Sequence, residues 1–106
     1  MSYTILWSDR ALSRVQELAD FVAQHSDAAA RRLVGDLFDR VQVLSDHPQL
    51  GIRFPDSPTH NVRILYVDRM RVYYVLDDER RTISVCTVQH GRQQPLSLEA
   101  AVEEAE

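Results

Sequence analysis

The side chains that could carry out chemistry in this 106-residue chain are few and scattered. The only thiol, Cys86, lies in an apolar, β-like run, where a buried cysteine behaves as a small hydrophobic residue. We therefore expect a structural and not a nucleophilic role for it. None of the histidines has a second ligand type at a spacing typical of zinc sites, so we expect no metal and no cofactor. The histidines are His25, His47, His60 and His90.

The guanidinium groups are unevenly distributed, and every basic residue is an arginine. Residues 1–52 carry five Arg against seven acidic residues, and residues 53–92 carry seven Arg against five. Residues 93–106 add four Glu and no basic residue, which makes the formal net charge −4. The middle stretch is therefore locally basic although the chain is acidic. Such a stretch could bind phosphate or carboxylate groups, but an ordinary solvated surface explains the same counts.

Apolar periodicity predicts a strand followed by two helices. Residues 3–7 alternate in the manner of a short strand with a buried face. Apolar residues then recur every three or four positions from about residue 9 to His25, after Ser8 or Asp9 as an N-cap. A second such stripe follows Ser26 and Asp27 and stops before the run Asp46-His47-Pro48. The short connection predicts an antiparallel helical hairpin.

Beyond an irregular crossing segment marked by Gly51, Pro55 and Pro58, the pattern changes to that of a sheet. Three runs rich in β-branched and aromatic residues predict strands, and they are Val62–Val67, Met70–Leu76 and Thr82–Val88. The linkers between them are short enough for hairpins, so we expect an antiparallel meander with the helices on one face. The other face, which carries arginines, is expected to be open to another macromolecule.

The predicted fold class is therefore α+β, in a single domain over residues 1–106. Ser97 can cap a short C-terminal helix within the tail formed by residues 95–106. No apolar run is long enough for a membrane span, and the first seven residues lack the features of a signal peptide. We therefore expect a cytoplasmic protein that does not contact a membrane.

Five short motifs, taken in order, resemble the RelE/ParE toxin superfamily. They are Trp7-Ser8-Asp9-Arg10-Ala11, Asp46-His47-Pro48 followed by Gly51, Val62-Arg63-Ile64-Leu65, Arg71-Val72-Tyr73-Tyr74-Val75 and Val88-Gln89-His90-Gly91-Arg92. The resemblance extends from Tyr3 to about Arg92 and implies a RelE/ParE-like fold and a growth-inhibiting toxin of a type II toxin–antitoxin system. It also implies a separately encoded ParD/RelB-like antitoxin that neutralises the toxin and is the only route by which the toxin reaches operator DNA.

Members of the RelE branch cleave messenger RNA on the ribosome, which requires cations around a phosphate and an acid/base group near the ribose hydroxyl. In this resemblance Arg63, Arg71 and Arg92 match basic positions of that branch. His90 is the nearby group that could transfer a proton near neutral pH. However, Leu65 replaces a second basic residue, and no tyrosine follows Arg92.

The His-Gly-Arg sequence after the last strand and the long helical hairpin resemble the ParE branch instead. Its members poison DNA gyrase by binding and break no bond themselves. Under this interpretation Arg63, Arg71, His90 and Arg92 bind the target, and no residue is catalytic. If the protein is a ribonuclease, the same four residues are the catalytic candidates.

A structural interpretation of these side chains also stays open. Arg63 and Arg71 could lie on the solvent face of the sheet and pair with Asp68 or Asp77. Aromatic residues of the strands could stack nucleic-acid bases or pack in the core, and these are Tyr66, Tyr73 and Tyr74.

The sequence thus leaves three functions. The protein is predicted to be a gyrase-poisoning toxin, with a ribosome-dependent endoribonuclease and an inactive antitoxin-binding co-repressor as the alternatives. Antitoxin contacts are expected on the hairpin grooves and the exposed sheet face. As a further hypothesis, the acidic tail from Glu99 to Glu106 folds over the Arg-bearing sheet and weakens the free toxin.

Overall fold

The computed structural model describes residues 2–54, 61–97 and 100–101 of the chain. In chain order its elements are β1 (Thr4–Trp7), α1 (Asp9–Ala23), α2 (Asp27–Gln42), the 3₁₀ turn η1 (Val43–Ser45), β2 (Ile52–Arg53), β3 (Val62–Val67), β4 (Met70–Asp77) and β5 (Thr82–His90). This order confirms the predicted α+β fold, with one strand, β2, that was not predicted.

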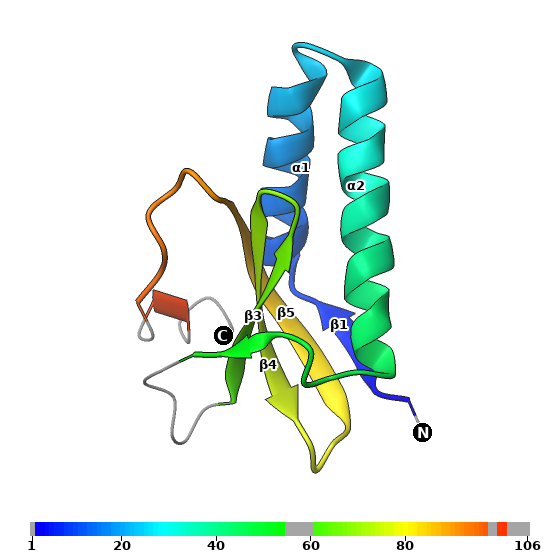
Figure 1. Ribbon diagram of the computed structural model, residues 1–106, viewed down its shortest axis with the longest axis vertical. Coiled ribbons are helices and arrows are strands. Elements are labelled where there is room, and N and C mark those ends of the chain that lie inside the picture. The colour runs from blue at the N-terminus through cyan, green and yellow to red at the C-terminus, as the bar shows by residue number, and fades with distance from the viewer. Residues whose placement is uncertain (1, 55–60, 98–99, 102–106) are drawn as a thin grey trace.

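Each helix begins at one of the two residues predicted to cap it. Ser8 Oγ accepts a hydrogen bond of 3.0 Å from the Ala11 N–H, and Ser26 Oγ accepts one of 3.1 Å from the Ala29 N–H. Caps of this kind stabilise a helix start by about 1 kcal/mol. The helices lie side by side as an antiparallel hairpin on one side of the sheet, and their connection projects beyond the ends of the strands (Figure 1).

The sheet contains five strands in the order β1-β5-β4-β3-β2. β3, β4 and β5 form the predicted antiparallel meander. Its two tight connections place Asp68 and Arg81 at φ values of 52°, in the left-handed region that only some residue types adopt readily.

The two outer strands pair in ways that the sequence did not predict. β1 runs parallel to β5, with Thr4 opposite Thr82. β2 pairs with β3 through only two residues, one of which places Ile52 opposite Ile64, inside the segment predicted to be irregular. Alternation along a strand specifies which face a side chain occupies, but it does not specify which strand lies alongside.

The main hydrophobic core lies between the helices and the sheet. Its largest fully buried aliphatic residues include Leu37 and Leu44 of the helical segment, and burial of such a side chain stabilises the fold by about 1.5–3 kcal/mol. Trp7 of β1 packs against Phe38 of α2, with ring centroids 4.4 Å apart. The sheet residues of this core are Leu65, Val67, Met70, Val72, Tyr74, Leu76, Ile83, Val85 and Val88.

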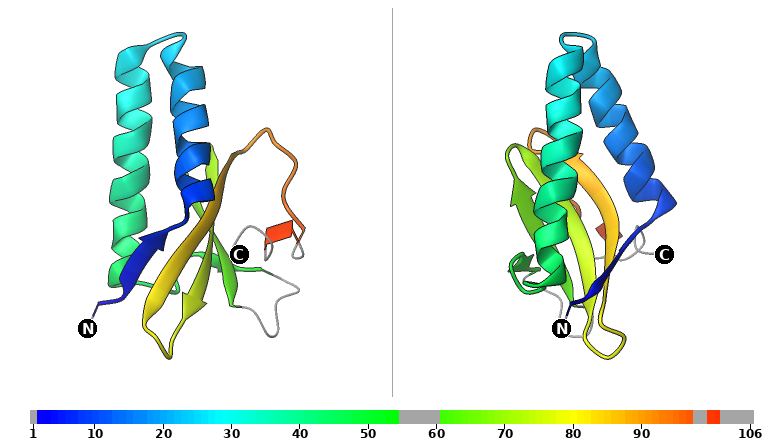
Figure 2. Two further views of the ribbon diagram at one scale, coloured as in Figure 1. Left: turned by 180° about the vertical axis from the view of Figure 1, so that it is seen from behind. Right: turned by 90° about the vertical axis from the view of Figure 1, so that its right-hand side faces the viewer.

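The opposite face of the sheet is covered over part of its area, so the prediction of a fully open face was wrong. A second buried cluster consists of Val62, Tyr73, Cys86 and Ala101, with Leu96 packed against it. The chain after β5 crosses to this side, away from the helices (Figure 2). The physical reason is that β4 carries large apolar residues on both of its faces, with Tyr73 and Val75 on this one, and such residues are stable only when both faces are covered. The predicted burial of Cys86 is confirmed.

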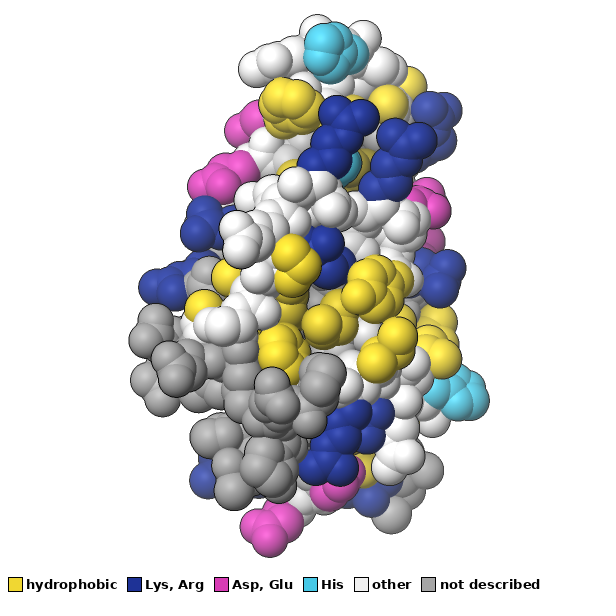
Figure 3. Space-filling model, turned by 60° about the vertical axis from the view of Figure 1, so that its left-hand side comes forward, with side chains coloured by type: hydrophobic (Ala, Val, Ile, Leu, Met, Phe, Trp, Pro, Cys, Tyr) yellow, Lys and Arg dark blue, Asp and Glu magenta, His cyan; other side chains and the backbone are white. Residues whose placement is uncertain are grey.

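Part of this second face remains exposed. Ile52 is 65% exposed and Tyr66 is 52% exposed, and Figure 3 shows apolar side chains on this side with arginines above and below them. Ser97 Oγ accepts a 3.2 Å hydrogen bond from the Ala100 N–H, as expected of a helix cap. The rest of the predicted C-terminal helix and the acidic tail lies outside the described residues.

Candidate functional site

The predicted site residues do not gather on one surface. Arg63 lies opposite Tyr74 in the β3–β4 register, on the side of the sheet that faces the helices. Arg71 lies on the other side, opposite Gln89 of β5. His90 ends β5, and Arg92 follows it in the turn.

Arg63 and Tyr74 together hold the segment that leads from the helices into the sheet, and we call this pair the upstream clamp. The Arg63 Nη1 donates to the carbonyls of Gly51 at 2.9 Å and Gln49 at 3.3 Å. The Tyr74 hydroxyl donates to the Pro48 carbonyl at 2.8 Å and accepts from the Gly51 N–H at 2.9 Å. Residues 48–51 are thereby fixed by two side chains of the neighbouring strands.

The upstream clamp leaves no room for a side chain at Gly51. A Cβ atom there would lie 2.6 Å from the Tyr74 hydroxyl oxygen and 3.0 Å from the Ile64 carbonyl oxygen. Burial raises the pKa of Tyr74 above its usual value of 10.0, and the hydrogen bond from Gly51 and the charge of Arg63 act in the opposite direction. Tyr74 is therefore a buried, neutral hydrogen-bonding residue and not a surface for stacking.

Arg71 holds the segment that leaves the sheet. Its side chain is buried, with only 7% of its surface exposed. The Nη1 atom donates to the Gly91 carbonyl at 3.3 Å, and Nη2 donates to the carbonyls of His90, at 3.4 Å, and Gln93. Nη2 also donates to the Gln89 side-chain oxygen at 3.3 Å.

The structural alternative, in which these arginines pair with Asp68 or Asp77 on the solvent face, is therefore contradicted. The two guanidinium groups bind backbone carbonyls instead, and Arg71 is sealed beneath the chain that follows β5. Both aspartates lie at or next to the strand ends, in or beside the hairpin turns, and Asp77 interacts with Arg80 of its own turn. Each arginine is the second residue of its strand, where its long side chain reaches the segment that crosses the sheet at that end.

The turn after β5 is tightly ordered around His90. The Gln93 N–H donates to the His90 carbonyl at 3.0 Å, and the Arg92 N–H donates to His90 Nδ1 at 3.0 Å. A Cβ atom on Gly91 would lie 2.9 Å from the Arg69 carbonyl oxygen, so glycine permits this close approach. The Arg92 side chain is exposed, and its guanidinium has no hydrogen bond or ion pair within the part of the chain that the structure describes.

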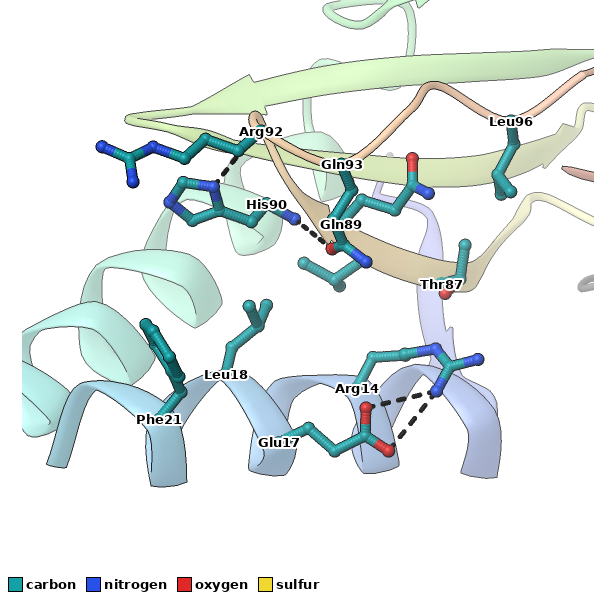
Figure 4. Close-up of a pocket in the computed structure, with 11 residues that line it drawn as sticks. Arg14, Glu17, Leu18, Phe21, Thr87, Gln89, His90, Arg92, Gln93 and Leu96 are labelled. Carbon is teal, nitrogen blue, oxygen red and sulfur yellow. Dashed lines mark hydrogen bonds and ion pairs between the residues drawn. The ribbon is translucent and has the colours of Figure 1, made fainter. Parts of the chain in front are cut away.

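A groove of about 570 Å³ lies between α1 and the end of β5, and its lining includes residues of the turn. Figure 4 shows Leu18 and Phe21 projecting from α1 toward the strand end, where His90 and Arg92 lie next to each other. Phe21 is 63% exposed, and this large apolar side chain gives the groove an apolar wall.

Sequence reasoning found the His90–Arg92 side of this groove and missed the α1 side. The available signal was Phe21, a large apolar residue outside the stripe that faces the core. An ion pair of 3.2 Å between Arg14 and Glu17 lies on the same wall. The site therefore combines an apolar wall with the exposed guanidinium of Arg92, which has no ion-pair partner among the described residues.

The described ranges contain no group of three His, Cys, Asp or Glu side chains that could hold a metal ion. Among the helices of those ranges, none is long and apolar enough to cross a membrane.

Thr87 lines the groove, and its buried hydroxyl has no hydrogen-bond partner among the residues that the structure describes.

Several solved structures are similar in fold. The toxin–antitoxin complex RelBE2 from Mycobacterium tuberculosis matches with 20% identity and a TM-score of 0.64 over 85% of this chain and 99% of that chain. The chromosomal ParDE toxin–antitoxin system from P. aeruginosa matches with 16% identity and a TM-score of 0.68 over 84% and 96%. A free RelE toxin from E. coli matches with 18% identity and a TM-score of 0.53 over 99% and 95%.

At these identities, the structural similarity shows the fold alone. Comparison with curated protein sequences gave no match. The model of one family, the ParE toxin of the type II toxin–antitoxin system parDE, matches residues 5–95. Because that match spans most of the sequence, in agreement with the fold, the chain belongs to the ParE toxin family of type II toxin–antitoxin systems.

Proposed function

We propose that this toxin inhibits growth by binding DNA gyrase, without cleaving RNA, and that a ParD-like antitoxin neutralises it. The observation that carries the proposal is the separation of the strand arginines. Arg63 faces the helices, whereas Arg71 is buried on the opposite side of the sheet. Both guanidinium groups bind carbonyls of their own chain.

Cleavage of RNA would require these groups to act together. Several cations and a proton-transfer group must surround one phosphate, because the charge that develops in the transition state is concentrated there. Arg63 and Arg71 lie on opposite faces and cannot meet at one phosphate, and His90 Nδ1 already accepts the Arg92 N–H. Arg92 is left as the cation that can contact a partner, beside an apolar groove. This combination supports binding to a protein surface more than it supports bond breaking.

The helical hairpin supports the antitoxin part of the proposal. A groove of about 410 Å³ runs between α1 and α2, and its lining includes the small apolar residues Ala19, Ala23, Ala30 and Val34. Small side chains allow the close approach of an amphipathic helix from a partner. Two of the structures similar in fold, RelBE2 and ParDE, are toxin–antitoxin systems.

The test is induced expression of the wild-type chain and of two arginine variants in a bacterial host. Arg92→Ala removes the exposed guanidinium of the groove, and Arg80→Ala is the matched control because Arg80 is an exposed arginine of the β4–β5 turn. We expect wild type and Arg80→Ala to stop replication and trap gyrase–DNA breaks while messenger RNA stays intact. Arg92→Ala should bind purified gyrase at least about tenfold more weakly, as expected of an arginine at the centre of an interface.

Circular dichroism establishes that each variant is folded. Fragmentation of ribosome-bound messenger RNA by the wild type would replace the proposal with the ribonuclease alternative. A folded wild type without effect on growth, replication or messenger RNA would favour the co-repressor alternative. Equal gyrase binding by the two arginine variants would show that Arg92 does not contact gyrase.

A further inference from the structure

We infer that three buried side chains, Arg71, Tyr73 and Gln89, form a positioning device that fixes the segment after β5 and so presents Arg92 to its target. We call these three residues the downstream clamp. The inference rests on the proposed function, because it assumes that Arg92 contacts the target. It assigns to Arg71 a role that acts through Arg92 and involves no contact with the target.

The members of the downstream clamp bind one another and the backbone of the segment. The Tyr73 hydroxyl donates to the Gln89 side-chain oxygen at 2.9 Å and accepts from the Leu96 N–H at 3.2 Å. The Gln89 side-chain amide donates to the Gln94 carbonyl at 3.1 Å. With the bonds from Arg71 to His90, Gly91 and Gln93, the clamp holds backbone groups along the whole stretch from residue 90 to residue 96.

Residues 90–93 also form hydrogen bonds within their own turn and to the Arg69 carbonyl, but few apolar contacts among the described residues hold the segment against the sheet. Residues 91–95 are exposed, and residues 94–97 have no regular secondary structure. Leu96 is the residue of this stretch that packs against the second buried cluster. A segment with few buried apolar contacts opens readily, so its position against the sheet depends on the hydrogen bonds of the clamp. Arg92 lies within it, bound through its N–H to His90 Nδ1, so the clamp acts on Arg92 by setting where this turn lies.

The choice of a buried arginine fits a positioning role. Removal of a guanidinium from water is unfavourable, and the described residues supply carbonyl and amide oxygens but no carboxylate to compensate it. The Arg71 Nε–H is buried without a hydrogen-bond partner in the same part of the chain. An apolar residue would avoid the cost of burying a charge, but it would leave these carbonyls without their donor and would not hold them in one arrangement. A preorganised turn loses less conformational entropy when a partner binds.

Tyr73→Phe tests the inference, because it removes one hydroxyl without changing the volume of the ring. Its matched control is Tyr74→Phe, at the adjacent position. Both tyrosines are fully buried, and each hydroxyl donates one hydrogen bond and accepts another, but Tyr74 holds the upstream segment. The two variants should therefore lose similar stability and differ in which segment they release.

The first measurement is amide hydrogen exchange, which does not depend on the target. We expect exchange at Leu96 to become about tenfold faster in Tyr73→Phe, because its N–H loses the partly buried hydrogen bond to the Tyr73 hydroxyl, and to stay unchanged in Tyr74→Phe. The second measurement is gyrase affinity, which should fall about tenfold in Tyr73→Phe and stay near the wild-type value in Tyr74→Phe.

A double-mutant cycle with Arg92→Ala shows whether Tyr73 acts through Arg92. In the Arg92→Ala background, Tyr73→Phe should have little further effect on affinity. Full additivity of the two losses in affinity, or equal behaviour of the two tyrosine variants, would overturn the inference.

If Arg92→Ala alone leaves gyrase binding intact, Arg92 does not contact gyrase and that part of the proposed function fails. Hydrogen exchange at Leu96 still shows whether the clamp fixes the segment. Should Tyr73→Phe not fold, Gln89→Met gives a second variant, because it removes the acceptor of the Tyr73 hydroxyl and the amide donor to Gln94 without adding a charge.

Discussion

The upstream and downstream clamps use the same two side-chain types on opposite faces of one sheet. Arg63 and Tyr74 bind the segment that enters the sheet, and Arg71 and Tyr73 bind the segment that leaves it. The upstream segment continues directly into β2, which pairs with β3, whereas the downstream segment is exposed and carries Arg92. The same chemistry therefore serves folding at one end of the meander and, in our proposal, presentation of a functional group at the other.

The comparison also shows that the type of a residue and its place in a motif do not by themselves give its role. Both arginines match basic positions of a toxin superfamily, and both were candidates for contact with a target. In the structure each one binds backbone carbonyls, and the guanidinium available to a partner at this site belongs to Arg92, outside the strands. A strand arginine is therefore weak evidence for a binding site until its hydrogen-bond partners are known.

The largest expected effect distinguishes the two arginines. Arg71→Met leaves the carbonyls around a buried site without donors, and we expect a loss of about 3 kcal/mol in the free energy of unfolding. Arg63→Met should cost about 1 kcal/mol, because Arg63 is only half-buried and water can replace it at the carbonyl of Gln49. Urea unfolding of both variants measures this difference. Equal losses in the free energy of unfolding would show that the deeper burial of Arg71 does not make it more important for stability than Arg63.

A smaller effect tests the packing of the upstream clamp. Gly51→Ala places a methyl group against the fully buried Tyr74, and we expect a loss of about 2 kcal/mol because the ring must shift. Gly35→Ala is the matched control: Gly35 lies in α2 with open space around it. There alanine should raise stability by up to about 1 kcal/mol through its higher helix propensity. A neutral Gly51→Ala would mean that Tyr74 can leave its hydrogen bonds without cost.

The smallest expected effect is a dependence on alkaline pH. Because the pKa of Tyr74 is raised in the folded protein, the neutral hydroxyl favours folding, and this contribution is constant below about pH 10. It is lost as the pH rises from about 10 through the folded-state pKa, since the unfolded chain then ionises first. Wild type should therefore lose stability more steeply than Tyr74→Phe in urea titrations at increasing alkaline pH. Tyr3, whose pKa is also raised, is present in both proteins and cancels in the comparison. If the stabilities of the two proteins fall in parallel as the pH rises, the raised pKa of Tyr74 is not the cause of the alkaline loss.

The sequence by itself determined the local structure of this protein. The strand Val62–Val67 has the predicted bounds, and Ser8 and Ser26 cap the helices as expected. These features depend on neighbours a few positions away, which periodicity and capping residues report directly. The ordered motifs also indicated the toxin superfamily, and the family match confirms it.

Only the tertiary structure decided how the second face of the sheet is covered and what the arginines bind. Arg71 reaches a carbonyl 22 positions away, and Tyr74 reaches one 26 positions away. A guanidinium can bind a carboxylate, water or a carbonyl, and nothing near it in the sequence selects among them. The selection is made by the chain segments that cross the sheet, because once water is excluded each buried donor and acceptor must find its partner there.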